Sequence, residues 1–115
     1  MSPAHENKNS DDLKAKTLDL AEIVRYQDGA IVSREIISRP AGTVTVFAFD
    51  KGEQLSEHTA PFDAMITVLD GEAEVTIGGQ ANLVKAGQMI IMPAAVPHAL
   101  IALTRFKMLL VMIKK

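Results

Sequence analysis

The sequence predicts an all-β protein, folded as a two-sheet sandwich or a closed barrel, and three observations lead to this class. Beyond residue 30 the chain consists of short apolar or alternating segments separated by glycine-containing turns. Two of these turns, Asp70-Gly71 and Gly78-Gly79, are dipeptides typical of β-hairpins. No long segment with helical periodicity follows Tyr26. Many short strands at such spacing are typical of sandwiches and barrels.

The predicted strands are segments in which β-branched and apolar residues either alternate with polar ones or run together. They are residues 31–38, 43–49, 64–69, 72–77, 81–84, 89–92, 98–102 and 106–113.

The N-terminal part of the chain lacks this pattern of short strands. Residues 1–16 are polar and mixed in charge, which predicts a flexible lead, and residues 17–115 are predicted to form one barrel domain. Between Leu18 and Ile23, whose spacing suits a hydrophobic staple, a short helical turn is expected. Asp19 is the expected cap of this turn and Glu22 its reciprocal partner. We expect the turn to plug one end of the barrel.

Composition excludes several classes of protein. A chain of 115 residues with 48% hydrophobic and 23% charged residues is expected to fold as one globular domain. The net charge is -2 and no basic cluster is present, so nucleic acid is not an expected partner. The longest apolar run, residues 108–113, is far shorter than the roughly 20 residues that cross a bilayer. With no secretory-type segment and no cysteine, a cytoplasmic protein is expected.

Two stretches carry a family resemblance. Gly52–Gly71, with His58 after five intervening residues, resembles the first motif of the cupins, and Gly87–His98, with Pro93 between, resembles the second. The chain is similar to small bacterial single-domain cupins. The resemblance implies a double-stranded β-helix, which is a jelly-roll barrel, over most of residues 30–113.

The chain departs from the cupin pattern at the positions that usually bind metal. In metal-binding cupins the first motif supplies two histidines and a glutamate, and the second motif supplies a third histidine. His58 and His98 match two of these four positions, whereas Ala60 and Ala64 stand where the second histidine and the glutamate would be. Catalytic zinc normally has three protein ligands. We therefore expect weak binding, if any, of a divalent transition metal such as zinc, iron, manganese or nickel.

Asp63 is the candidate for a third metal ligand. Because strand side chains alternate between faces, Asp63 should face outward if His58, Ala60 and Ala64 face inward. A bulge at Pro61-Phe62 would turn the Asp63 carboxylate inward.

The pocket predicted between the motifs is largely apolar, since alanine at positions 60 and 64 removes bulk from its wall. Its imidazoles can orient a carboxylate or hydroxyl ligand, or act as acid and base. The lining expected from strand parity is His58, Ala60, Ala64, Ile66, Val68, Met92, His98 and Leu100.

Three classes of function remain open. The first is a domain that binds a small organic molecule with weak metal binding or none, and the missing ligands favour this class. The second is a metal-dependent enzyme on a small substrate, such as an oxygenase, isomerase or decarboxylase, using His58 and His98. The third is a structural or oligomerising module with a vestigial pocket.

The last predicted strand bears on the oligomeric state. Residues 108–113 are apolar on both alternating faces, and a barrel has one interior, so something must cover the other face. The segment Leu18–Val24 is one candidate cover and a second subunit is the other. The resemblance to cupins, which frequently pair, favours a homodimer.

Overall fold

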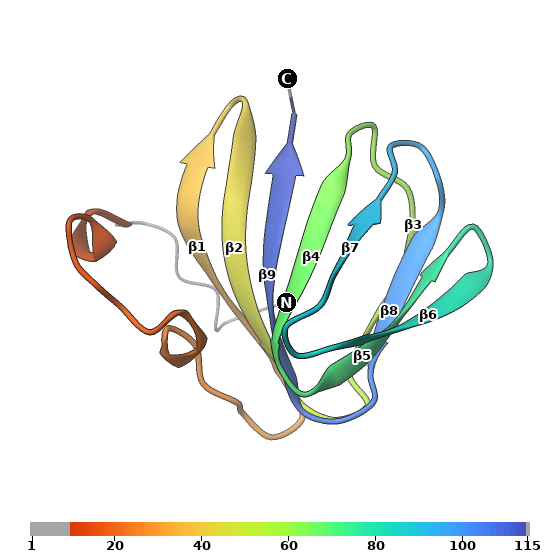
Figure 1. Ribbon diagram of the computed structural model, residues 1–115, viewed down its shortest axis with the longest axis horizontal. Coiled ribbons are helices and arrows are strands. Elements are labelled where there is room, and N and C mark those ends of the chain that lie inside the picture. The colour runs from red at the N-terminus through yellow and green to blue at the C-terminus, as the bar shows by residue number, and fades with distance from the viewer. Residues whose placement is uncertain (1–9, 115) are drawn as a thin grey trace.

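The computed structural model describes residues 10–114 and has nine strands in that range (Figure 1). They are β1 (Ile31–Arg39), β2 (Gly42–Phe49), β3 (Gln54–His58), β4 (Ala64–Asp70), β5 (Glu72–Ile77), β6 (Gln80–Lys85), β7 (Met89–Met92), β8 (His98–Ala102) and β9 (Phe106–Ile113). The all-β prediction is confirmed, and eight strands lie where the sequence pattern placed them. The pattern missed β3, because its sequence Gln-Leu-Ser-Glu-His contains one apolar residue and no alternation.

The strands form two antiparallel sheets that face each other. Sheet A has the order β1-β2-β9-β4-β7, and sheet B has the order β3-β8-β5-β6. In Figure 1 sheet A fans from the left to the centre and sheet B lies to the right. Strand β9 pairs with both β2 and β4, so the last strand of the chain is the middle strand of sheet A.

The main core lies between the sheets and follows from strand alternation. In β4, Ala64, Ile66 and Val68 are buried while the residues between them are partly exposed. At one end of the core the rings of Phe49 and Phe106 stack with centroids 4.6 Å apart.

The N-terminal segment contains two 3₁₀ turns, η1 (Ser10–Leu13) and η2 (Leu20–Glu22). Residues 1–9 of the expected lead lie outside the described residues. The short turn was expected near η2, but the Asp19 side chain makes no capping hydrogen bond; the backbone carbonyl of Asp19 accepts from the Glu22 N–H instead, at 2.9 Å. Within residues 10–114, no helix is long and apolar enough to span a membrane.

The segment from η2 to Tyr26 covers part of the outer face of sheet A, and the expectation that the helical turn plugs a barrel end is wrong. Val24 is buried against a second hydrophobic cluster that includes Val46 and Ala48 on that outer face. The Tyr26 hydroxyl donates to the Asp70 carboxylate at 2.5 Å, and the buried Lys107 ammonium donates to the Ala21 carbonyl at 2.5 Å. These bonds hold the segment against β4 and β9.

The rest of that outer face is not covered by the described residues. One row of apolar side chains, which we call the apolar row, crosses all five strands of sheet A in direct register: Ile37, Val44, Val111, Met65 and Ile91. Its two end members, Ile37 and Ile91, are 50% and 53% exposed. The N-terminal segment therefore covers only part of the outer face of sheet A, to which β9 belongs.

Candidate functional site

The two motif histidines meet between the sheets. His58 ends β3 and His98 begins β8, and the two residues are direct partners in the ladder between these strands. Their Nε2 atoms are 3.1 Å apart, and the rings meet edge to face with centroids separated by 4.4 Å. His98 is buried, at 7% exposure, while His58 is exposed. The pair therefore has one ring inside the barrel and the other at its rim.

A backbone carbonyl orients each ring. The His58 Nδ1 lies 2.8 Å from the Ser56 carbonyl oxygen, and the His98 Nδ1 lies 3.2 Å from that of Val96. A carbonyl can only accept a hydrogen bond, so each Nδ1 is the donor in its contact. The 3.1 Å contact between the two Nε2 atoms is also a hydrogen bond, in which one nitrogen donates and the other accepts.

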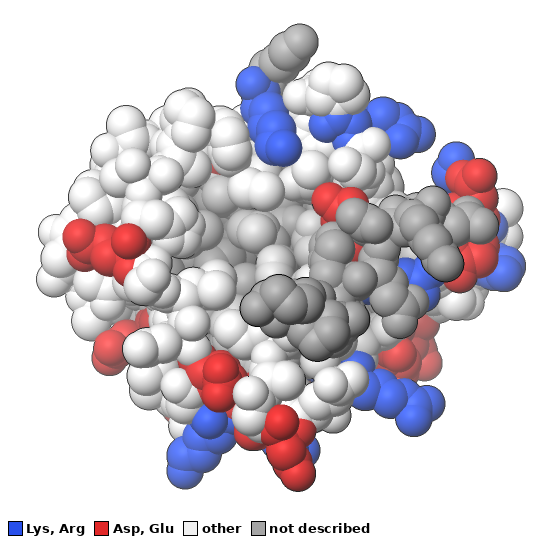
Figure 2. Space-filling view, turned by 180° about the vertical axis from the view of Figure 1, so that it is seen from behind, with Lys and Arg blue, Asp and Glu red and all other residues white. Residues whose placement is uncertain are grey.

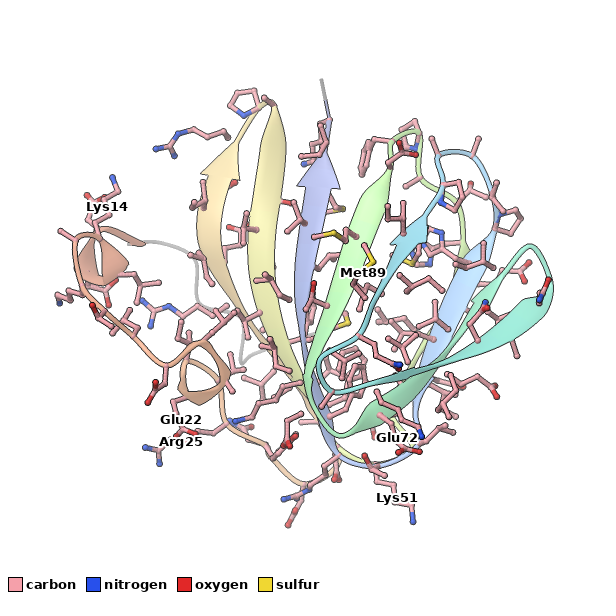
Figure 3. The ribbon with its side chains drawn as sticks, viewed as in Figure 1. Lys14, Glu22, Arg25, Lys51, Glu72 and Met89 are labelled. Carbon is pink, nitrogen blue, oxygen red and sulfur yellow. The ribbon has the colours of Figure 1, made fainter. Side chains whose placement is uncertain are left out.

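The imidazoles open onto a pocket of about 70 Å³ between the sheets. Apart from the two histidines, every lining side chain is apolar: Leu55, Ala60, Ala64, Ile66, Met92, Ala99, Leu100, Met108, Leu110 and Met112. Figure 3 shows side chains of both sheets pointing into the space between them, with methionine sulfur atoms among them. The site thus combines two polar nitrogens with an apolar wall.

Charged groups stand away from this site. No Lys, Arg, Asp or Glu among the described residues lines the pocket. On the face seen from behind, a broad uncharged area contains a hollow, and charged side chains lie mainly around its edge (Figure 2).

Seven of the eight residues expected to line the pocket do so, and five further residues line it with them. Val68 has the inward parity but is packed into the core at 1% exposure and does not line the pocket. The structure adds Leu55, Ala99 and, from β9, Met108, Leu110 and Met112. Strand alternation in residues 106–113 predicts that Met108, Leu110 and Met112 share one face. Only the pairing of β9 with β4 identifies that face as the pocket wall.

The donor set does not fit a resident catalytic metal. The Nε2 atoms of His58 and His98 are close enough to contact one ion, but Ala60 and Ala64 line the same pocket without donors. Within residues 10–114 no group of three or more His, Cys, Asp or Glu side chains is arranged to hold a metal ion. Two imidazoles fall short of the three protein ligands that catalytic zinc normally has.

Asp63, the candidate third ligand, is hydrogen-bonded to the backbone instead. Its carboxylate accepts a hydrogen bond from the Ala94 N–H at 2.8 Å, and the residue is exposed outside the pocket lining. The neighbouring Ala95 N–H donates to the Ala60 carbonyl at 2.7 Å. These two bonds fix the loop before His98 against the segment that follows His58.

Comparison with known proteins identifies the family. The cupin domain model matches residues 45–114, so the chain belongs to the cupin family and its fold is the jelly-roll barrel of that family. A search of curated proteins gave no match.

Solved structures agree with this assignment. A conserved protein of unknown function from Streptococcus pyogenes is 44% identical, with a TM-score of 0.85 over 88% of this chain and 89% of that one. A cupin 2 conserved barrel domain protein from Leptotrichia buccalis is also 44% identical, with a TM-score of 0.82 over 84% of this chain; this chain spans 47% of that protein. A cupin superfamily protein from Desulfitobacterium hafniense is 25% identical, with a TM-score of 0.84 over 89% of this chain and 94% of that one.

Proposed function

We propose that this cupin domain binds a small, largely apolar organic molecule in the pocket, with His58 and His98 as its polar anchor. The observation that carries the proposal is the lining, in which, among the residues that the structure describes, two imidazoles are the only polar side chains of an otherwise apolar wall. An apolar pocket with a few convergent polar groups is the usual form of a small-ligand site.

The size of the cavity limits the ligand. A water-sized group occupies roughly 10–15 Å³ of such a volume, so about 70 Å³ takes a molecule of roughly five to seven heavy atoms. A single six-membered ring with one small substituent is the upper end of this range.

The two alternatives receive less support from the site. A metal-dependent enzyme of the oxygenase, isomerase or decarboxylase type needs more donors than the histidine pair supplies. A purely structural module gives no reason for an apolar cavity with one histidine ring inside it and a second at its rim, each oriented by a backbone carbonyl.

Calorimetric titration with cyclohexanol, a neutral one-ring probe, tests the proposal. The unmodified protein should bind it saturably, and Ala60→Leu should abolish binding because the added side chain fills the pocket. Thr59→Leu is the matched control, because Thr59 is exposed and outside the lining. Equal binding by all three proteins, or no binding by any of them, would contradict the proposal.

A further inference from the structure

The hydrogen bonds of the histidine pair determine its charge, and the charge determines the kind of ligand. We infer that His58 and His98 together carry one positive charge, and that the site takes a small molecule in which a carboxylate is attached to an apolar body. This inference rests on the proposed function and adds to it the chemistry of the anchor.

The first step concerns the number of hydrogens on the two rings. The pair makes three hydrogen bonds: each Nδ1 to a carbonyl oxygen, at 2.8 Å and 3.2 Å, and one Nε2 to the other, at 3.1 Å. Each of these bonds needs one hydrogen, which the rings must supply because a carbonyl oxygen only accepts. A neutral imidazole has a single N–H, so two neutral rings are one hydrogen short. With the third hydrogen in place one ring is an imidazolium, and the pair has a single positive charge.

The second step concerns the counter-charge. No Asp or Glu among the described residues lines the pocket, and no Lys or Arg among them lies there to repel an anion. Of the acidic residues close to His58 in sequence, Glu57 is exposed outside the lining, and the Asp63 carboxylate accepts from the Ala94 N–H. A charge beside an apolar wall is costly unless it is paired. The pocket is therefore suited to an anionic group of the ligand.

The third step concerns how the carboxylate is held. The hydrogen between the two Nε2 atoms is the one hydrogen of the pair that is not bonded to the backbone. His98 lines the pocket from inside, at 7% exposure, whereas His58 is exposed at the rim. A carboxylate in the pocket can accept this hydrogen from the Nε2 of His98, while the Nε2 of His58 turns to water. Such a charge-assisted bond is roughly twice as strong as one between neutral groups.

The experiment compares pivalate with pivalamide by calorimetric titration at pH 6 in the presence of a chelator, with cyclohexanol as the neutral reference probe. Pivalate and pivalamide have the same branched apolar body and nearly the same shape, so the difference between them reports charge. Pivalate should bind at least about tenfold more tightly, because a hydrogen bond to a charged group stabilises more than a neutral one. His98→Gln should remove this preference, since the remaining ring lies at the rim in solvent, and Thr59→Leu should keep it.

The outcomes separate this inference from the proposed function. Saturable binding of cyclohexanol with equal affinities for pivalate and pivalamide would overturn the inference and leave the proposed function standing. Absence of binding by all three probes would overturn both. A preference for pivalate that appears only without chelator would mean that a trace metal binds the carboxylate, and would overturn the inference.

A measurement on the unmodified protein gives an independent test. Nitrogen-15 spectra of the imidazoles distinguish a nitrogen that carries hydrogen from one that does not. In the pivalate complex at pH 6 the inference expects hydrogen on both Nδ1 atoms and on at least one Nε2. Two Nε2 atoms without hydrogen in that complex would overturn it.

Discussion

At the scale of single residues, two alanines determine what the histidine pair can bind. Ala60 and Ala64 line the pocket beside His58 and His98, at positions where metal-binding cupins are expected to carry a histidine and a glutamate. The unmodified protein is expected to bind Zn²⁺ weakly. The double substitution Ala60→His with Ala64→Glu should raise the affinity at least about 100-fold, since loss of even an outer-shell partner typically costs 10–100-fold. Competition with a chromophoric chelator measures this change.

Asp63 provides the control for that prediction. Because its carboxylate accepts from the Ala94 N–H, Asp63→Ala should leave the Zn²⁺ affinity of the unmodified protein unchanged. Tight stoichiometric zinc in the unmodified protein, lost in Asp63→Ala, would show that this residue is a ligand after all.

Ala95 adopts a backbone conformation that suits glycine. Its φ of 65° lies in the left-handed region, where an L side chain costs roughly 1–2 kcal/mol. The Val96 N–H closes the turn on the Pro93 carbonyl, so Ala95 occupies the third turn position, which favours glycine when φ is positive. Ala95→Gly should therefore raise the free energy of unfolding by about 0.5–1 kcal/mol in urea titration.

The adjacent alanine is the matched control for this substitution. Ala94 does not have a positive φ, so Ala94→Gly should lower the free energy of unfolding by roughly 0.5–1 kcal/mol. Equal effects of the two substitutions would contradict the strain assigned to Ala95.

Alternation predicted most of the site residues, and its misses have physical causes. It placed Ala64, Ile66 and Met92 on the pocket side because strand side chains change face at each residue. Alternation could not predict that Val68, on the same face, is enclosed by other core side chains and does not reach the pocket. Nor could it predict how the Asp63 side chain is used, because its partner Ala94 is 31 residues away.

At the scale of elements, Asp50 joins three segments at one end of the barrel. Its carboxylate accepts from the Gly29 N–H at 2.6 Å, the Arg105 Nε at 2.8 Å and its neighbour's N–H at 2.9 Å. The Gly29 hydrogen bond first, and the Arg105 guanidinium second, lower the pKa of Asp50 from 3.8 to about 2. The charged carboxylate thus ties the end of β2 to the turns before β1 and β9.

This pKa shift predicts how stability depends on pH. A group whose pKa is lower in the folded state stabilises the fold above its unfolded pKa, and that contribution is lost as the pH falls through its folded pKa. The melting temperature should therefore fall between about pH 4 and pH 2, and Asp50→Asn should lower it at pH 7 and flatten that part of the profile.

Asp28 offers a comparison with the same partner. It also pairs with Arg105, but its side chain is 97% exposed, so Asp28→Asn should change the melting temperature and its pH profile much less. An unchanged pH profile in Asp50→Asn would contradict the role given to Asp50.

Strand positions were readable from the sequence, whereas sheet order was not. Glycine turns and alternation are local signals, and they located eight of the nine strands. The central place of β9 in sheet A depends on pairing with β2 and β4, which lie far away in sequence. The packing of Val24 on the outer face of sheet A is likewise a long-range contact, so the sequence pattern indicated a turn but not its location.

At the scale of the whole molecule, the apolar row has the properties of a contact between two copies of the chain. We propose a homodimer formed through this row. It contains no charged side chain and is centred on Val111 of the middle strand β9. A two-fold axis there would lay Ile37 of one copy opposite Ile91 of the other, the self-complementary arrangement of closed dimers. Residues 1–9 are mostly polar, with Met1 their one large apolar side chain, and are poorly suited to cover it.

Sedimentation equilibrium at micromolar concentration tests the dimer. The unmodified protein should have twice the mass of one chain, and Ile91→Lys should be monomeric because it buries a charge in the contact. Leu83→Lys is the matched control, since Leu83 is similarly exposed, at 51%, but lies on β6 of sheet B. A monomer mass for the unmodified protein, or dissociation by both substitutions, would contradict this interface.

The central claim, that the pocket binds a small organic molecule, is tested most directly by methyl NMR of methionine during titration with cyclohexanol. Met92, Met108 and Met112 line the pocket, whereas Met65 and Met89 lie outside its lining on the opposite face of sheet A; Met89 is labelled in Figure 3. The account predicts saturable shifts of the three pocket methyls with one dissociation constant, and no shift of the other two. Unchanged pocket methyls at saturating probe, or shifts confined to Met65 and Met89, would contradict it.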